Sequence, residues 1–120
     1  MGLQEWWRNR GRDLVLFPHD ENGDVLWGMH RAGDDLHAAR DMDFFFIFPN
    51  RRSAEQFCSV AVQQGFRVAL AWFDEKQAWD ATCTIPIAPT HARVAEVETA
   101  LAQAARSMGG KPDGWGAVAQ

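Results

Sequence analysis

Asp41 and Asp43 are the two residues whose spacing best suits acid–base chemistry. They flank Met42 at the start of an apolar run, and in an extended chain both carboxylates point to the same side. Such a pair catalyses proton transfer only where the surroundings push the two pKa values apart. Charged residues at the point where a strand meets solvent are the commoner arrangement, and we therefore predict no enzyme and no catalytic residue.

The other reactive side chains show no spacing that is typical of a site. Four histidines lie in predicted loops or near predicted helix ends, without an HxxxH or HExxH pattern: His19, His30, His37 and His91. Cys58 and Cys83 lack a CxxC spacing and have apolar neighbours, which favours buried free thiols. Gly109-Gly110 follows a predicted helix, whereas a phosphate-binding loop precedes one. We expect no metal and no cofactor.

The composition indicates one globular domain without the charge pattern of a nucleic-acid-binding protein. The chain has 120 residues, of which 47% are hydrophobic and 23% charged, and its net charge is -4. Nucleic-acid binding is driven by clustered Lys and Arg, which a mildly acidic chain lacks. No apolar run reaches the roughly 20 residues of a membrane span, and the N-terminus lacks a signal-peptide core. We expect a cytoplasmic protein that contacts no membrane and no nucleic acid directly.

The stretch 41–49 organises the predicted fold. Its apolar run is too short for an ordinary helix and is closed by a proline, which is typical of a strand buried on both faces. Alternation divides the apolar side chains into two sets, Phe44, Phe46 and Phe48 on one face and Phe45 and Ile47 on the other. Both faces of this central strand must therefore be covered by something.

Six more elements are predicted around this strand. They are a helix over 24–33, a helix over 53–64, a hairpin of strands over 66–73 and 78–85, a helix over 90–108 and a last strand over 115–118. The expected helix caps are Asn22 or Asp24 with Gly33, then Ser53 with Gln56, and then Thr90 with Gly109-Gly110. Pro86 and Pro89 are expected to end the second hairpin strand.

The pattern within these elements predicts which side chains face the core. In the helix over 53–64 the buried stripe is Ala54, Phe57, Cys58, Ala61 and Val62. In the hairpin the inward-facing set is Phe66, Val68, Leu70, Trp72, Trp79, Ala81, Cys83 and Ile85. Asp80, Thr82 and Thr84 then point outward, and one face of the sheet is partly polar.

The order strand, helix, strand, strand, helix, strand predicts an α+β fold, the ferredoxin-like plait. Both main helices then pack on one face of an antiparallel sheet whose first and third strands are central. Residues 24–120 would form this domain, after an extension over 1–23 that contains Trp6, Trp7 and a short strand over 14–17. The extension is expected to pack on the domain and is one candidate cover for the open sheet face. A second copy of the chain is another candidate cover, so we expect a monomer or a homodimer formed through that face. Alternatively, the extension over 1–23 comes from cloning or from an upstream start site.

Four motifs in the predicted domain carry a resemblance. They are Phe48-Pro49 with Ala54-Glu55, Trp79-Asp80 with alternating Thr, Pro89-Thr90-His91 and, most specific of all, Asp113-Gly114-Trp115-Gly116 after the long helix. Over residues 24–120 the chain resembles the family called regulator of ribonuclease E activity B. The resemblance implies a non-enzymatic bacterial protein with a ferredoxin-like plait. It also implies that the protein binds ribonuclease E, the endonuclease of messenger-RNA decay, and lowers its activity.

We expect such a partner to contact the open face of the sheet. The residues predicted for this contact are Phe45, Ile47, Asp80, Thr82, Asp113, Gly114 and Trp115. For Trp115 we favour packing in the core against the long helix. Asp113-Gly114 would form a turn in which Gly114 adopts positive φ, and Gly116 would allow a close backbone approach. The alternative for Trp115 is an anchor in the partner.

Two other functions stay open. The plait is also the frame of RNA-recognition modules, in which Phe45 or Phe46 would stack on bases and Arg51 and Arg52 would support the contact. The third strand lacks the aromatic pattern of such modules, and Asp80 would face the phosphates. An immunity-like partner of a toxin is the second alternative.

Overall fold

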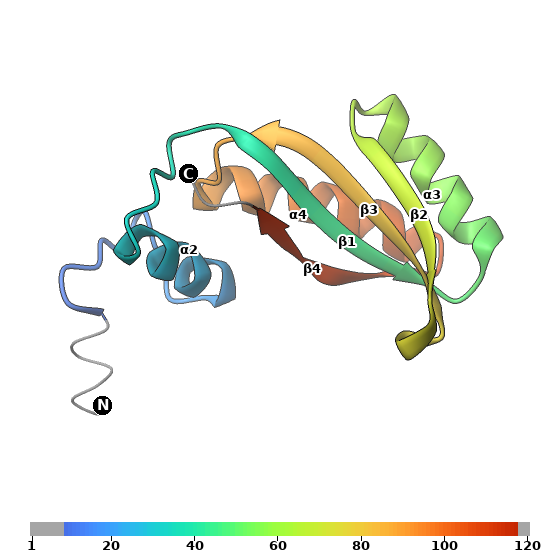
Figure 1. The fold of residues 1–120 in the computed structure, drawn as a ribbon, viewed down its shortest axis with the longest axis horizontal. Coiled ribbons are helices and arrows are strands. Elements are labelled where there is room, and N and C mark those ends of the chain that lie inside the picture. Colours follow the sequence, from blue (N-terminus) through green and yellow to red (C-terminus); the bar gives the residue numbers. More distant parts are fainter. Residues whose placement is uncertain (1–8, 118–120) are drawn as a thin grey trace.

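The computed structural model describes residues 9–117 of the chain. Its elements are α2 (Glu21–Arg31), β1 (Arg40–Phe48), α3 (Arg51–Gln63), β2 (Arg67–Phe73), β3 (Ala78–Ile87), α4 (His91–Ser107) and β4 (Lys111–Ala117), with a 3-10 turn η1 (Asp74–Lys76) between β2 and β3 (Figure 1). This is an α+β arrangement, as predicted. Within residues 9–117 no helix is long and apolar enough to cross a membrane.

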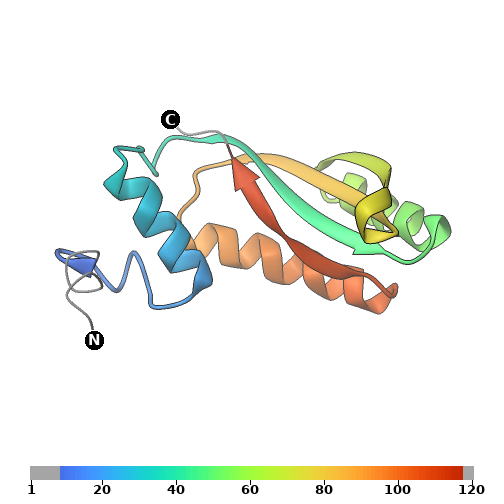
Figure 2. The same cartoon turned by 60° about the horizontal axis from the view of Figure 1, so that its bottom comes forward.

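The four strands form one antiparallel sheet in the order β2-β3-β1-β4. The first and third strands are therefore central, as predicted, and β2 and β4 are the edges. Helices α3 and α4 lie on the same side of the sheet, as Figures 1 and 2 show from two directions. The arrangement is compatible with a plait-like fold, and no element of the described part covers the opposite face.

The main core lies between the sheet and these two helices. From Met42 onward every second side chain of β1 is at most 1% exposed, namely Met42, Phe44, Phe46 and Phe48. Phe57 of α3 packs against the rings of Phe46 and Phe48, with ring centroids 5.1 Å apart in each pair. The α4 stripe that includes Val94, Val97, Leu101 and Ala105 completes this core. The prediction that Phe44, Phe46 and Phe48 share one face of β1 is confirmed, and this face lies in the core.

The helix caps differ from the prediction at two of three N-termini. Helix α3 begins two residues early because the Asn50 side chain accepts a 2.8 Å hydrogen bond from the Ser53 amide, so the Ser53 capping box is wrong. Asp20, not Asn22 or Asp24, caps α2. Thr90 caps α4 as predicted. At the other end of α2 the C-cap is Ala32, and the predicted cap Gly33 follows it with a positive φ of 93.

Strands β3 and β4 are longer than predicted. Pro86 does not end β3, because β2 pairs only as far as Thr84 and beyond that point β3 has a neighbour on one side alone. A proline lacks the backbone N–H, which costs nothing where that side of the strand is unpaired. Strand β4 begins at Lys111, before the Asp-Gly pair that was predicted as a turn, and Val118 lies outside the described residues.

The predicted strand over 14–17 is wrong. This stretch forms turns, held by the Arg12 guanidinium, which donates to the carbonyl oxygens of Phe17 at 2.8 Å and Pro18 at 2.6 Å. Phe17 packs in a second cluster with Leu26, Trp27 and Leu36. This cluster and α2 lie beyond one end of the sheet rather than over its open face (Figure 1). Trp6 and Trp7, which were predicted in the same extension, lie outside the described residues.

A buried ion pair fixes the segment between α2 and the sheet. Arg40 Nη1 lies 2.8 Å from both carboxylate oxygens of Asp34, and both side chains are 2% exposed. Arg40 also donates to the carbonyl oxygens of Asp35 and Ala38, which satisfies the buried guanidinium. Both residues lie between the predicted helix over 24–33 and the stretch 41–49, where the sequence predicts no element.

Candidate protein-binding surface

The open face of the sheet has four predicted contact residues at its centre. Phe45 pairs with Thr82 and Ile47 with Asp80 across β1 and β3. Directly paired residues share a face of the sheet, and all four point away from α3 and α4. Their side chains are half-buried by their neighbours on the sheet alone. The structure therefore brings Phe45, Ile47, Asp80 and Thr82 together into one surface, which we call the open face.

Two carboxylates sit on the open face beside threonines. Thr84 Oγ1 donates to Asp43 Oδ1 at 2.5 Å, and Thr82 Oγ1 donates to Asp80 Oδ2 at 3.1 Å. Desolvation by burial raises the pKa of Asp80; the neighbouring Asp113 also raises it, whereas the Thr82 hydrogen bond and Lys76 lower it. Asp80 thus carries a charge that its surroundings disfavour.

Two ion pairs lie at opposite margins of this face. Arg67 Nη2 lies 2.7 Å from Asp41 Oδ2, and Lys76 Nζ lies 2.6 Å from Asp113. Exposed pairs such as Arg67–Asp41 stabilise a fold by about 0–1 kcal/mol. The two candidate acid–base residues therefore have separate partners, since Asp41 pairs with Arg67 and Asp43 with Thr84.

The described residues contain no cluster suited to metal or nucleophilic chemistry. No group of three His, Cys, Asp or Glu side chains within 9–117 is placed to hold a metal ion. Cys58 and Cys83 are buried free thiols, as predicted. Desolvation by burial raises the pKa of both thiols, to about 12 for Cys83, so neither is activated as a nucleophile.

The Asp113-Gly114 pair forms a bulge inside β4. The register of β4 against β1 shifts by one residue between Phe44 and Phe46, and Gly114 has φ +99. The positive φ of Gly114 is confirmed, although the turn is a bulge within a longer strand. A Cβ on Gly116 would lie 3.7 Å from Phe45, which is ordinary contact, so the close approach predicted there is wrong. The close approach occurs at Gly110, where a Cβ would come within 2.3 Å of the Phe48 ring.

Trp115 lies on the helix side of the sheet. It pairs with Phe44 and packs against both hydrophobic clusters. Its indole N–H donates to Asn22 Oδ1 at 2.9 Å, and Asn22 Nδ2 donates to Glu98 Oε1 at 2.6 Å. This chain of contacts joins β4, α2 and α4. The packing agrees with the core role that the sequence favoured, and the side chain is on the opposite side of the sheet from Phe45.

Sequence reasoning missed Asn22 as the partner of Trp115 and Glu98 as the partner of Asn22. A partly buried indole usually finds an acceptor, so the existence of one was foreseeable. Asn22 was predicted only as a helix cap, and Glu98 was not singled out. Asn22 is 93 residues from Trp115 in the chain, and Glu98 is 76 residues from Asn22. No local pattern predicts such a contact.

An open acidic groove runs beside the hydrogen bonds that join Trp115, Asn22 and Glu98. It has a volume of about 650 Å³, and its lining includes Asp20, Glu21, Glu98 and Asp113. The Gly23 amide, which donates a hydrogen bond to Asp20, and then His91 lower the pKa of the Asp20 carboxyl. Asp113, Gly114 and Trp115 also line the groove. The predicted contact residues of β4 thus border a different hollow from the centre of the open face.

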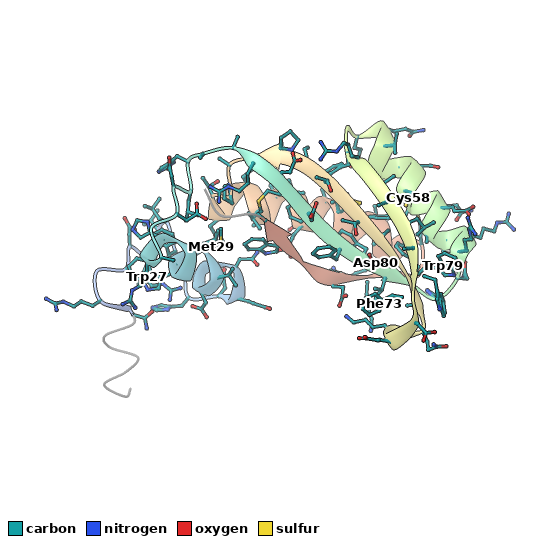
Figure 3. All side chains as sticks on the ribbon, in the orientation of Figure 1. Trp27, Met29, Cys58, Phe73, Trp79 and Asp80 are labelled. Carbon is teal, nitrogen blue, oxygen red and sulfur yellow. The ribbon has the colours of Figure 1, made fainter. Side chains whose placement is uncertain are left out.

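An aromatic patch at the β2–β3 hairpin was also missed. Trp72 was predicted to face the core but is 45% exposed, and Phe73 is 39% exposed. Trp79 stands edge-on to Trp72 with centroids 5.6 Å apart and lies under Arg51 at 5.1 Å. Figure 3 shows Phe73, Trp79 and Asp80 at this same end of the sheet. Trp72 pairs with Trp79 on the helix side of the sheet, as alternation predicts, but it lies near the end of the edge strand β2, and alternation alone does not predict its exposure.

The chain matches a known protein family. A family model described as regulator of ribonuclease activity B matches residues 19–117. The match covers most of the chain and includes every helix and strand from α2 to β4. A search of curated proteins found no match to the chain.

Proposed function

The chain belongs to the family of regulators of ribonuclease activity B, and from this premise we propose that it binds a ribonuclease and lowers its activity. The proposed partner is ribonuclease E, and the proposed place is the bacterial cytoplasm. The chain performs no reaction itself in this proposal. Its effect comes from occupying a surface of the nuclease, for which a stable protein surface is sufficient.

The open face is the surface that we propose for this contact. Its centre holds two large apolar side chains, Phe45 and Ile47, with only the sheet itself to bury them. Apolar centres surrounded by polar residues are typical of protein interfaces, and a few such residues carry most of the binding free energy. Asp80 and Thr82 complete the centre, and Asp113 and Gly114 form its β4 margin. In this proposal Trp115 holds β4 in place and does not touch the nuclease.

The observation that carries the proposal is the family match over a fold whose one bare sheet face holds Phe45 and Ile47 at its centre. The residues 9–20 that were candidates to cover this face lie at the far end of the molecule (Figure 1). A homodimer formed through the open face would compete with the nuclease in this scheme.

The test uses purified protein and purified nuclease. We expect binding at micromolar protein and low salt, and slower cleavage of a labelled RNA substrate. Phe45→Ala should weaken binding by about 2 kcal/mol, or roughly 30-fold, and relieve inhibition to the same extent. The matched control is Val62→Ala. The prediction that Val62 belongs to the buried stripe of α3 is wrong, because this apolar side chain is 54% exposed.

Three results would count against the proposal. The first is no binding under these conditions, and the second is binding without any change in the cleavage rate. The third is equal loss of inhibition in the Phe45 and Val62 variants. Direct binding of short single-stranded RNA, with a steep dependence on salt, would instead support the RNA-binding alternative.

A further inference from the structure

The charges on the open face are unevenly compensated. The cations Arg67 and Lys76 are at its margins, where each pairs with its own carboxylate. Within residues 9–117, the only hydrogen-bond partners of the Asp43 and Asp80 carboxylates are threonine hydroxyls. Neither Asp43 nor Asp80 therefore forms an ion pair within residues 9–117, although Lys76 acts on Asp80 from the margin of the face.

The spacing of these two carboxylates is set by the register of the sheet. Asp43 lies on β1 opposite Thr84, and Asp80 lies on β3 opposite Ile47. Four residues of strand separate the two positions, about 13 Å along the strands, with one strand spacing of about 4.8 Å across. Phe45 lies between them on the same face.

An extended segment has the matching period. Its residues i, i+2 and i+4 point to one side, and the first and last of these are about 13 Å apart. Two cations at i and i+4 would reach Asp43 and Asp80, and an apolar side chain at i+2 would meet Phe45. A cation next to Asp80 would also offset the desolvation that now disfavours its charge.

Resting on the proposed function, we propose that the part of the partner which docks on the open face is a basic, extended polypeptide segment with Lys or Arg four residues apart around an apolar residue. Charge complementarity selects this occupant over RNA, whose phosphates would meet Asp43 and Asp80. The segment belongs to the nuclease in the complex and is recognised by its pattern of charges.

Replacement of Lys111 should change the binding of a basic segment in the direction opposite to replacement of Asp43 or Asp80. Lys111 pairs with Ile47 and so lies at the β4 margin of the same face. Removal of this positive charge should strengthen the binding of a basic segment about twofold at low salt. The same change should weaken the binding of RNA.

The experiment uses the full chain and two labelled peptides in fluorescence anisotropy. One peptide carries Lys-Ser-Leu-Ser-Lys between Gly-Ser flanks, and the other has the same composition with adjacent lysines. We expect the spaced peptide to bind about tenfold more tightly. Asp43→Asn and Asp80→Asn should each weaken it three- to fivefold and reduce the salt dependence, and Lys111→Gln should strengthen it. The matched control is Asp35→Asn, because Asp35 is an exposed carboxylate in the linker before β1.

The same variants are then measured against the nuclease. In one outcome the nuclease binds, while Asp43→Asn and Asp80→Asn change the affinity for the nuclease and for the spaced peptide no more than Asp35→Asn does. That result overturns the basic-segment proposal and leaves the proposed function standing. If the spaced peptide depends on both carboxylates but the nuclease does not bind, the proposed function is overturned and the basic-segment proposal stands. Equal binding of the two peptides, or weaker peptide binding by Lys111→Gln, also overturns the proposal.

Discussion

Replacement of Trp115 separates a structural role of the Asp-Gly-Trp motif from a contact with the nuclease. The side chain is half-buried between the two clusters, and its N–H is bound by Asn22. Deleting a fully buried Phe or Trp side chain costs about 3–5 kcal/mol of unfolding free energy. Because Trp115 is only half-buried, we expect Trp115→Ala to cost about 2–3 kcal/mol, of which the hydrogen bond contributes about 1 kcal/mol.

The assay is urea unfolding followed by circular dichroism, with nuclease binding measured on the same samples. Trp115→Phe keeps most of the apolar volume and removes the donor, so it should cost about 1 kcal/mol. Combined with Asn22→Ala in a double-mutant cycle, it should show a coupling energy of about 0.5–1.5 kcal/mol. Domains of this kind have a stability of about 5–15 kcal/mol, so every variant should stay folded and bind the nuclease with unchanged affinity.

One result would refute this reasoning. If Trp115→Ala unfolds within about 0.5 kcal/mol of the unchanged protein while its affinity for the nuclease collapses, the indole is an anchor in the partner and not a tie within the fold. Zero coupling between Trp115 and Asn22 would show that their hydrogen bond does not stabilise the protein.

Three further outcomes follow from contacts elsewhere. Asp34→Ala removes the carboxylate that neutralises a buried guanidinium and should cost about 3–5 kcal/mol in urea unfolding, whereas Asp41→Ala breaks an exposed pair and should cost about 0–1 kcal/mol. Gly114→Ala meets no atom within 4 Å but must adopt φ +99, so it should destabilise by about 1–2 kcal/mol, and Gly116→Ala by less. Burial raises the pKa of Asp80, so its ionised form destabilises the fold at neutral pH. Asp80→Asn should therefore raise the melting temperature at pH 7. This gain in melting temperature should vanish as the pH falls through the raised pKa of Asp80.

The central part of the fold could be predicted because the relevant signals are local and repetitive. The phenylalanine run, the hairpin and the long helix each carry their own period, and the order of elements then fixes which strands are central. The family was identified from motifs in the same elements, and the match over residues 19–117 confirms it.

The failures occurred where two local signals compete or where contacts are distant in sequence. Asn50 and Ser53 both have capping side chains, and only the path of the chain after Pro49 selects Asn50. Residues 14–17 have apolar composition suited to a strand, but no strand edge is within their reach and Phe17 packs on α2 instead. Propensity gives no information about either outcome, because tertiary contacts decide both.

The bulge in β4 explains how one short strand serves both sides of the sheet. In a regular strand, residues four apart such as Lys111 and Trp115 would point to the same face. The extra residue at Asp113-Gly114 shifts the register by one, so that Trp115 joins Phe44 on the helix side while Lys111 joins Ile47 on the open face. Gly114 supplies the positive φ that this shift requires. The same motif can therefore fasten β4 to α2 and still leave its first residues beside the surface proposed for the nuclease.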